Sequence, residues 1–375
     1  MSPVAMGSVS ENSLRVKRKG FVMTITLNRP EALNTLNLEA IRRIRRAMDE
    51  GAASDGVRLI LLRGAGGRAF CAGGDIKFMS QAVRDKDVDR ALRFLREEYD
   101  LDLLIHGFPK PVVVMAHGIT MGGGLGLAAG ADLVVATEQT RMAMPETRIG
   151  FFPDVGATGW MFAKCPPGFP EFLGLTGYEM RGAECVRLGF ADCLLPSAQL
   201  DDAISVIEGA GPGLPHEKDR ATKEIRALLE PVTLNEIPSN PDMDQWVREY
   251  FKGKSSIPEL LNDLRQCSIQ GTLCDGVFAR LSERSPTGVV LTLGLLRHNE
   301  RRPMESVYRT DIEAARFMLT HHDFAEGVRA RLLDKDDNPQ WRPARFEDVG
   351  PLEKGSDLLL ALVNPVRGPV NAKGH

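Results

Sequence analysis

Apolar segments that alternate with segments of helical period restrict the fold of this chain more than any other feature. Residues 21–27 (FVMTITL) carry apolar side chains at alternate positions, which predicts a strand. Residues 37–50 change to helical spacing, with Asn37 as an N-cap and Gly51 directly after the end. Residues 57–63 (VRLILLR) are apolar almost throughout, as expected of a strand buried on both faces.

This alternation continues through the first half of the chain. Residues 111–115, 133–136 and 192–195 predict further strands, whereas 122–129 and 181–188 predict short helices. Strands that alternate with helices indicate an α/β architecture around a largely buried sheet.

The second half has a different character. Residues 209–215 are rich in Gly and Pro and predict a connection, and five stretches of helical spacing follow it: 219–229, 244–252, 257–267, 287–298 and 304–320. A chain of 375 residues is long enough for about two folded units. We therefore predict an α/β region over residues 15–205 and a mostly helical region over residues 206–350.

Composition excludes several classes of protein. The net charge is −3 with acids and bases mixed along the chain, so no polyanionic partner such as nucleic acid is expected. The six cysteines are scattered without a CxxC pair, which predicts reduced thiols, and no metal site is expected. No apolar run approaches the roughly 18–20 residues that a membrane span requires. The first fifteen residues lack the apolar core of a secretory signal. These features predict a cytoplasmic protein with no membrane association, and a mitochondrial matrix location stays open for a processed eukaryotic chain.

Two glycine-rich segments each follow a predicted buried strand. They are residues 64–77 (GAGGRAFCAGGDIK) and 117–126 (HGITMGGGLG). Glycine lets a backbone N–H approach a ligand without a Cβ in the way. Two such N–H groups from different loops would form an oxyanion hole. The alternative is that the glycines serve turns and close helix–strand packing.

Two carboxylates lie in apolar surroundings farther along the chain. Glu146 and Asp154 belong to the segment MPETRIGFFPDVG (144–156), and each follows a proline directly. An acid in an apolar environment is paired, hydrogen-bonded or shifted in pKa, and such groups often transfer protons. The alternative is that Glu146 caps a turn and Asp154 caps the following helix.

Together these segments resemble the crotonase superfamily over residues 15–205. CAGGDIK (71–77) and MGGGLG (121–126) are similar to the two oxyanion-hole signatures of that superfamily, with Gly74 and Gly123 at the N–H donor positions. The resemblance implies a spiral of ββα repeats and a coenzyme-A thioester whose carbonyl oxygen lies in the hole. It also implies a helical C-terminal part that closes the site.

One departure from the superfamily pattern narrows the chemistry. Enoyl-CoA hydratases use two glutamates, and the first ends a GGGCE pattern that aligns here with GGGLG, so that Gly126 replaces it. The second glutamate matches Glu146, and Asp154 stands where hydratases usually carry a small residue. This combination resembles the 3-hydroxyisobutyryl-CoA hydrolases within the superfamily.

The hydrolase resemblance implies further site residues. The segment HDFAEGVRARLLDKDDNPQW (322–341) also resembles those hydrolases, and within it we expect Phe324 to pack and the charges to cap. Glu98 in REEY (96–99) matches a substrate-contacting glutamate, with a solvated helix face as the alternative. Gly123, Glu146 and Asp154 are the other substrate-binding positions.

The implied activity is hydrolysis of a short branched 3-hydroxyacyl-CoA thioester. Glu146 would attack the carbonyl or activate a water molecule, and Asp154 would orient the water or the substrate hydroxyl. No cofactor is expected, because coenzyme A arrives as part of the substrate. An enoyl-CoA hydratase or isomerase and a non-catalytic acyl-CoA-binding subunit remain as alternatives. Assembly as a homo-oligomer also stays open.

Overall fold

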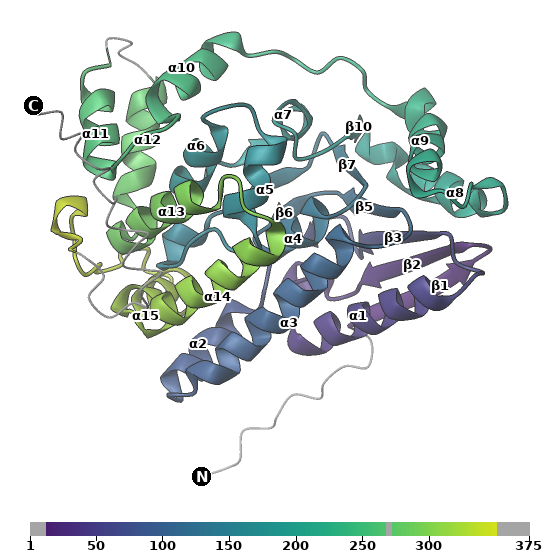
Figure 1. Cartoon of the computed structure of the whole chain (residues 1–375), viewed down its shortest axis with the longest axis horizontal. Coiled ribbons are helices and arrows are strands. Elements are labelled where there is room, and N and C mark those ends of the chain that lie inside the picture. The colour runs from purple at the N-terminus through teal and green to yellow at the C-terminus, as the bar shows by residue number, and fades with distance from the viewer. Residues whose placement is uncertain (1–12, 268–271, 351–375) are drawn as a thin grey trace, which may run out of the picture.

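The fold was analysed in a computed structural model that describes residues 13–267 and 272–350 (Figure 1). Its strands form two sheets. The larger has six strands in the order β1-β2-β3-β5-β7-β10, all parallel except for the antiparallel pair β1–β2. These strands are β1 (Leu14–Lys19), β2 (Val22–Leu27), β3 (Leu59–Gly64), β5 (Val112–Ala116), β7 (Leu133–Thr137) and β10 (Cys193–Leu195).

The smaller sheet has four short strands in the order β4-β6-β8-β9. They are β4 (Ala69–Cys71), β6 (Ile119–Met121), β8 (Arg141–Ala143) and β9 (Met180–Arg181). β3, β5 and β7 of the large sheet are each followed by a strand of the small sheet and then by helical residues. This repeated strand–strand–helix unit confirms the predicted spiral and the α/β class.

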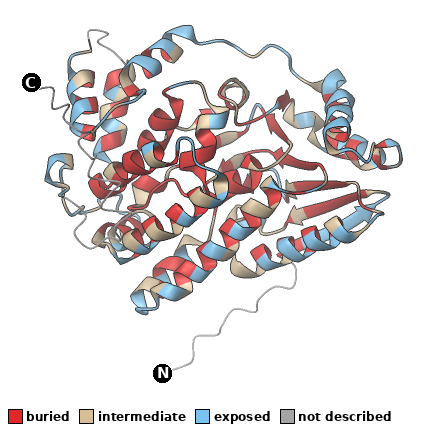
Figure 2. Cartoon of the chain, viewed as in Figure 1, coloured by how far each residue is buried: buried red, intermediate tan, exposed pale blue. Residues whose placement is uncertain are grey.

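Helices cover both faces of the large sheet. On one face, α8 (Leu200–Gly209) and α9 (Lys218–Leu229) pack their apolar residues against Leu59, Leu61 and Val113. The other face belongs to a larger cluster that includes α1 (Leu38–Ala53) and α3 (Val88–His106). Figure 2 shows that the buried residues concentrate in the strands and central helices, as expected of a sheet covered on both sides.

The helices of the C-terminal part pack directly on the α/β part. They are α10 (Pro241–Phe251), α11 (Ile257–Arg265), α12 (Thr272–Ser282), α13 (Pro286–Asn299), α14 (Met304–Thr320) and α15 (His322–Val328). α13 contacts α5 (Ala157–Lys164), and α14 contacts both α5 and α3. One hydrophobic cluster includes residues of both parts. The division at residue 205 stays a prediction.

Two differences between the local structure and the predictions bear on the site and its packing. α1 continues through Gly51, where a Cβ would lie 2.7 Å from Ile60 Cδ1, so this glycine permits close packing on β3 and does not end the helix. α2 (Ile76–Arg84) and most of α3 were not predicted. In α3, acidic residues interrupt the apolar pattern, and Glu98 and Asp102 are buried with the apolar face.

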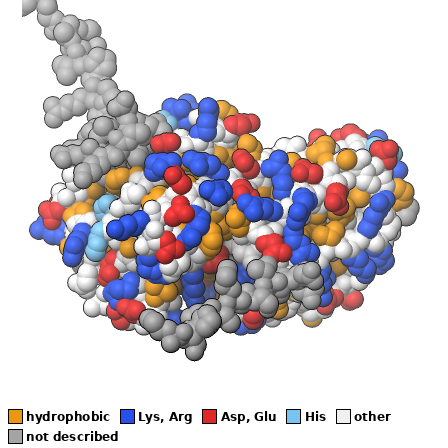
Figure 3. All heavy atoms as spheres, turned by 90° about the horizontal axis from the view of Figure 1, so that it is seen from below, with side chains coloured by type: hydrophobic (Ala, Val, Ile, Leu, Met, Phe, Trp, Pro, Cys, Tyr) orange, Lys and Arg blue, Asp and Glu red, His pale blue; other side chains and the backbone are white. Residues whose placement is uncertain are grey.

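The surface and the thiols fit the composition. Figure 3 shows acidic and basic side chains interspersed over one face of the molecule. Four of the six cysteines are buried: Cys71, Cys185, Cys193 and Cys274. Within residues 13–267 and 272–350, no helix is long and apolar enough to cross a membrane. In the same ranges, no three His, Cys, Asp or Glu side chains gather in a way that could hold a metal ion.

Candidate active site

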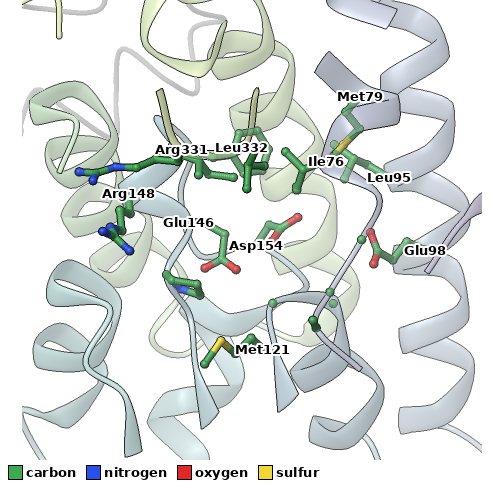
Figure 4. Close-up of a pocket in the computed structure, with 18 of the residues that line it drawn as sticks. Ile76, Met79, Leu95, Glu98, Met121, Glu146, Arg148, Asp154, Arg331 and Leu332 are labelled. Atoms are coloured by element: carbon green, nitrogen blue, oxygen red, sulfur yellow. The ribbon is translucent and has the colours of Figure 1, made fainter. Parts of the chain in front are cut away.

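A cavity of about 290 Å³ lies where the two glycine-rich loops meet α3 and the C-terminal part. The five residues named from the sequence all line it: Gly74, Glu98, Gly123, Glu146 and Asp154. In Figure 4, Glu146 and Asp154 point toward the centre of the cavity, and Glu98 approaches from α3. The fold thus brings together residues that are up to 80 positions apart in the chain.

The two glycine amides that were predicted to bind an oxyanion lie close together. Gly74 follows β4, Gly123 begins α4 (Gly123–Ala129), and a Cβ on Gly123 would lie 3.3 Å from the Gly74 nitrogen. The residue before each donor, Gly73 or Gly122, has a positive φ (106° and 52°), which side chains other than glycine disfavour. Within the described part of the chain, neither N–H donates to a protein acceptor. Both donors therefore remain available to a ligand.

The Glu146 carboxyl lies beside this pair of amides. Its Oε1 is 2.8 Å from where a Cβ on Gly122 would lie, and its Oε2 has no hydrogen-bond partner among the described residues. Burial and then the negative charge of Asp154 raise the pKa of Glu146 well above its ordinary value, and the Arg284 guanidinium opposes the shift. The side chain does not cap the short helical turn Glu146–Ile149. An uncommitted, desolvated carboxylate suits nucleophilic or proton-transfer chemistry.

Asp154 is fixed by a hydrogen bond from α3. Tyr99 Oη donates to Asp154 Oδ2 over 2.7 Å, and both side chains are buried. Burial raises the pKa of Asp154 to about 6, although the hydrogen bond from Tyr99 lowers it. The Asp154 side chain does not cap α5, whose N-cap is Gly156. The capping alternatives for Glu146 and Asp154 are therefore both wrong.

Glu98 faces the cavity and is only 2% exposed. A Cβ on Gly123 would lie 2.1 Å from its Oε1, so its carboxyl lies against the second oxyanion donor. Burial and the charge of Asp154 raise the pKa of Glu98 well above its ordinary value. The solvated position belongs to its neighbour Glu97, which pairs with Arg42 over 2.6 and 2.7 Å. The solvated-face alternative for Glu98 is therefore wrong.

The segment after α15 closes one side of the cavity. Arg331 and Leu332 line it, and Arg331 Nη1 donates to Asp337 Oδ1 over 2.6 Å. Phe324 is fully buried with its ring centroid 5.6 Å from that of Phe151, as predicted. The charged residues of this segment do not cap a helix as predicted, however.

Instead, His321 Nδ1 caps α15 by accepting from the backbone N–H of Asp323 over 3.2 Å. The Asp323 carboxylate accepts from Ser285 Oγ over 2.5 Å. Asp323, one of the charged residues that were expected to cap, therefore joins α15 to the start of α13.

Sequence reasoning missed several residues that hold the site. Tyr99 stands next to Glu98 in the REEY segment and could have been found from that position. Asp311 on α14 accepts from the Gly156 N–H over 2.8 Å and so supports the loop that carries Asp154. No local signal marks Asp311, because an acid on a long polar helix usually faces solvent.

Gly126 marks the place where hydratases carry their other glutamate. A Cβ there would lie 2.6 Å from Asp102 Oδ2 and 2.8 Å from Val155 Cβ. The space is filled by side chains from α3 and from the loop before α5. No larger side chain fits at this position in the present packing.

The fold and the arrangement of the cavity define a crotonase-type acyl-CoA enzyme. A family model described as enoyl-CoA hydratase/isomerase matches residues 22–355, and the chain belongs to this family. It is 34% identical over 349 residues to the mitochondrial 3-hydroxyisobutyryl-CoA hydrolase of Homo sapiens, covering 89% of this chain and 85% of that protein. The protein of the same name from Rattus norvegicus is 35% identical over 357 residues, with 89% and 85% covered.

Solved structures show the same fold. A carnitinyl-CoA dehydratase from Mycobacterium thermoresistibile superposes with a TM-score of 0.82 at 30% identity, covering 97% of this chain and 100% of that one. An enoyl-CoA hydratase from Rhodobacter sphaeroides 2.4.1 has a TM-score of 0.81 at 28% identity, with 94% and 98% covered.

Proposed function

We propose that this protein hydrolyses a short branched 3-hydroxyacyl-CoA thioester, converting 3-hydroxyisobutyryl-CoA to 3-hydroxyisobutyrate and coenzyme A in valine degradation. The observation that carries the proposal is the position of buried Glu146 beside two glycine amides, with no second glutamate at Gly126. Among the described residues, Glu146 Oε2 has no hydrogen-bond partner and neither amide donates to an acceptor. The names of the human and rat relatives describe this reaction for those proteins.

The thioester carbonyl oxygen would accept hydrogen bonds from the Gly74 and Gly123 amides. These donors are fixed before the substrate arrives, so little reorganisation is needed as negative charge develops on the oxygen. One such donor typically contributes about 10²–10³ in rate. The carbonyl carbon then lies next to Glu146, whose Oε1 is near Gly122.

Glu146 has two chemically sound roles at this position. As a nucleophile it would form a mixed anhydride with the acyl group, and as a base it would deprotonate the attacking water. Both roles require the carboxylate form. The coenzyme-A thiolate is an adequate leaving group because thiols have pKa values of about 8.5.

Asp154 and Glu98 are proposed to orient the acyl group and the water. Asp154 is held by Tyr99 and lies close enough to Glu146 for its charge to shift the pKa of that group. Glu98 lies against Gly123, so its carboxyl borders the place of the carbonyl oxygen. Because ionised Glu98 would repel a developing oxyanion, the raised pKa of Glu98 favours the productive neutral form.

The proposed reaction uses no metal and no redox cofactor, with coenzyme A as part of the substrate. The human and rat relatives carry mitochondrial in their names. Those names support the mitochondrial matrix option for this chain over the cytoplasmic one. Homo-oligomer assembly stays a prediction.

An enoyl-CoA hydratase is the second candidate, because the similar solved structures carry hydratase and dehydratase names. The packing at Gly126 argues against it, since Asp102 and Val155 occupy the space that another glutamate would need. A non-catalytic acyl-CoA-binding subunit is disfavoured for a different reason. Binding alone does not require two buried acids beside the amide pair.

The test compares 3-hydroxyisobutyryl-CoA with crotonyl-CoA on the purified protein. Free thiol is measured with a chromogenic disulfide, and the enoyl double bond is followed by its ultraviolet absorbance. We expect thiol release from the hydroxyacyl ester and no loss of the enoyl absorbance. Enoyl hydration without thiol release would establish the hydratase instead, and ester binding with neither reaction would establish the binding subunit.

A further inference from the structure

A row of ionisable side chains runs along the face of α3 that packs on α4. Glu98, Asp102 and His106 are four residues apart, so they lie on one face of the helix. Each of these side chains lies against a glycine that belongs to α4 or forms its C-cap. A Cβ added to that glycine would overlap the side chain. These positions are Gly123 (2.1 Å from Glu98 Oε1), Gly126 (2.6 Å from Asp102 Oδ2) and Gly130 (3.0 Å from the His106 ring).

Four polar atoms of this row have no hydrogen-bond partner among the described residues. Glu98 Oε1, both carboxyl oxygens of Asp102 and His106 Nε2 accept or donate no hydrogen bond within the described residues, and neither does the nearby Tyr308 hydroxyl. Asp102 is completely buried. Buried polar groups are normally paired, and ordered water fills this role where protein groups do not. The row therefore suits a chain of water-linked groups inside the protein.

The row leads from the cavity toward the surface. Glu98 lines the cavity, and Asp102 lies one turn farther along α3. His106 in the last turn is partly buried, with its Nε2 enclosed. The His106 and Tyr308 rings are 6.4 Å apart. Tyr308 also lines a groove between α3 and α14 on the outside of the molecule.

The proposed hydrolysis releases a proton that must leave the cavity. Water adds to the carbonyl carbon as the C–S bond breaks, and one of its protons ends on the coenzyme-A sulfur. The other leaves the carboxylic acid product, because this acid is ionised at neutral pH while the thiol is not. Each turnover therefore produces a carboxylate, a thiol and one free proton.

We propose that Glu98, Asp102 and His106 form a relay that carries this proton from the cavity to solvent. The inference rests on the proposed hydrolase function. Neutral Glu98 takes this proton as it passes its own to water, water delivers that proton to Asp102, which hands on its own in the same way, and the imidazole of His106 releases one at the C-terminal end of α3. Asp102 acts through Glu98, so it is a positioning residue that touches no substrate.

The surrounding charges suit this role. Burial raises the pKa of Glu98 and Asp102 well above ordinary values, so each keeps a proton to a higher pH than an ordinary carboxyl group does. Burial and Lys164 lower the pKa of His106 to about 4, which makes the neutral ring a carrier that does not retain the proton. The titratable groups that interact with the row are Cys71, Tyr99, Glu146, Asp154 and Tyr308 along its buried part, and Lys164 and Glu305 at His106.

The test uses Asp102→Asn and His106→Ala in the full chain, with His298→Ala as a control that removes a histidine outside the row. Thiol release is measured in weak buffer with and without added imidazole. Because proton exit follows the irreversible C–S cleavage, kcat should fall about tenfold while kcat/KM stays constant, a smaller loss than the about 10²–10⁴ of a direct acid–base residue. Imidazole should restore kcat in His106→Ala only, because Asp102 is sealed inside.

Other outcomes distinguish a failure of the relay proposal from a failure of the proposed hydrolase function. Wild-type kcat in both variants, or equal falls in kcat and kcat/KM without imidazole rescue, would overturn the relay and leave the hydrolase in place. The His106→Ala variant decides the matter even if Asp102→Asn fails to fold. No thiol release by the wild-type protein would overturn the hydrolase proposal itself.

Discussion

Tyr99 Oη donates a 2.7 Å hydrogen bond to Asp154 Oδ2, which joins α3 to the loop before α5 beside the cavity. Asp311 on α14 holds the same loop from its other side by accepting from the Gly156 N–H. The position of Asp154 thus depends on helices from both halves of the chain. This dependence explains why the C-terminal helices matter for a site whose named residues all lie in the first half.

Removing the Tyr99 hydroxyl should weaken catalysis without loss of the fold. A hydrogen bond to a charged group contributes about 1.5–3 kcal/mol, so Tyr99→Phe should lower kcat/KM about tenfold or more. The pKa of Asp154, about 6 in the native protein, should rise because the bond now lowers it. Tyr178→Phe is the matched control, since its hydroxyl bonds to Glu184 outside the cavity. Equal activity in the two variants would remove Tyr99 from the site.

The pH profile should report the coupling between Glu146 and Asp154. Glu146 must be ionised to act, and its pKa is raised above the ordinary 4.5, so kcat/KM should fall with decreasing pH at values above 4.5. Asp154→Asn removes a negative charge that disfavours ionisation of Glu146. The fall of kcat/KM on the acid side of the pH profile should therefore occur at lower pH in the variant than in the wild type, whatever the level of activity that remains. A limb that stays in place or shifts upward would contradict the coupling.

The amide pair should tolerate no side chain at Gly123. A Cβ there would lie 2.1 Å from Glu98 Oε1 and 3.3 Å from the Gly74 nitrogen. Gly123→Ala should displace one donor and lower kcat by about 10²–10³, the usual effect of losing one such group. Gly67→Ala is the control in the other glycine-rich segment, because nothing lies within 4 Å of a Cβ there. If both variants kept wild-type kcat, the Gly123 amide would not bind the oxyanion.

The sequence was sufficient for the α/β class, which depends on local patterns, and for the five cavity residues, of which Gly74, Gly123 and Glu98 were named through the resemblance to the crotonase superfamily. Buried strands such as 112–116 are recognisable from apolar runs, and glycine-rich loops keep their spacing. The packing of Phe324 was also predictable. Acidic residues on the buried face obscured α3, so its extent was not predicted.

Tertiary contacts account for the rest. Asp102 and Asp311 have the residue type of a solvated helix face, yet both are fully buried by packing that no local pattern encodes. Gly51 stands where the sequence pattern predicts the end of a helix, but in the structure it allows α1 to pack closely on Ile60. Such residues become interpretable only when neighbouring elements are placed.

The most direct test of the account is thiol release from 3-hydroxyisobutyryl-CoA by the wild-type protein and by Glu146→Gln, with ester binding measured in parallel by calorimetry. The amide keeps the size of the side chain but is neither a nucleophile nor a base. The account predicts steady thiol release by the wild type, none above background by the variant, and retained binding by both. Wild-type turnover in Glu146→Gln would contradict it, because no other residue has been assigned the attack or the activation of water.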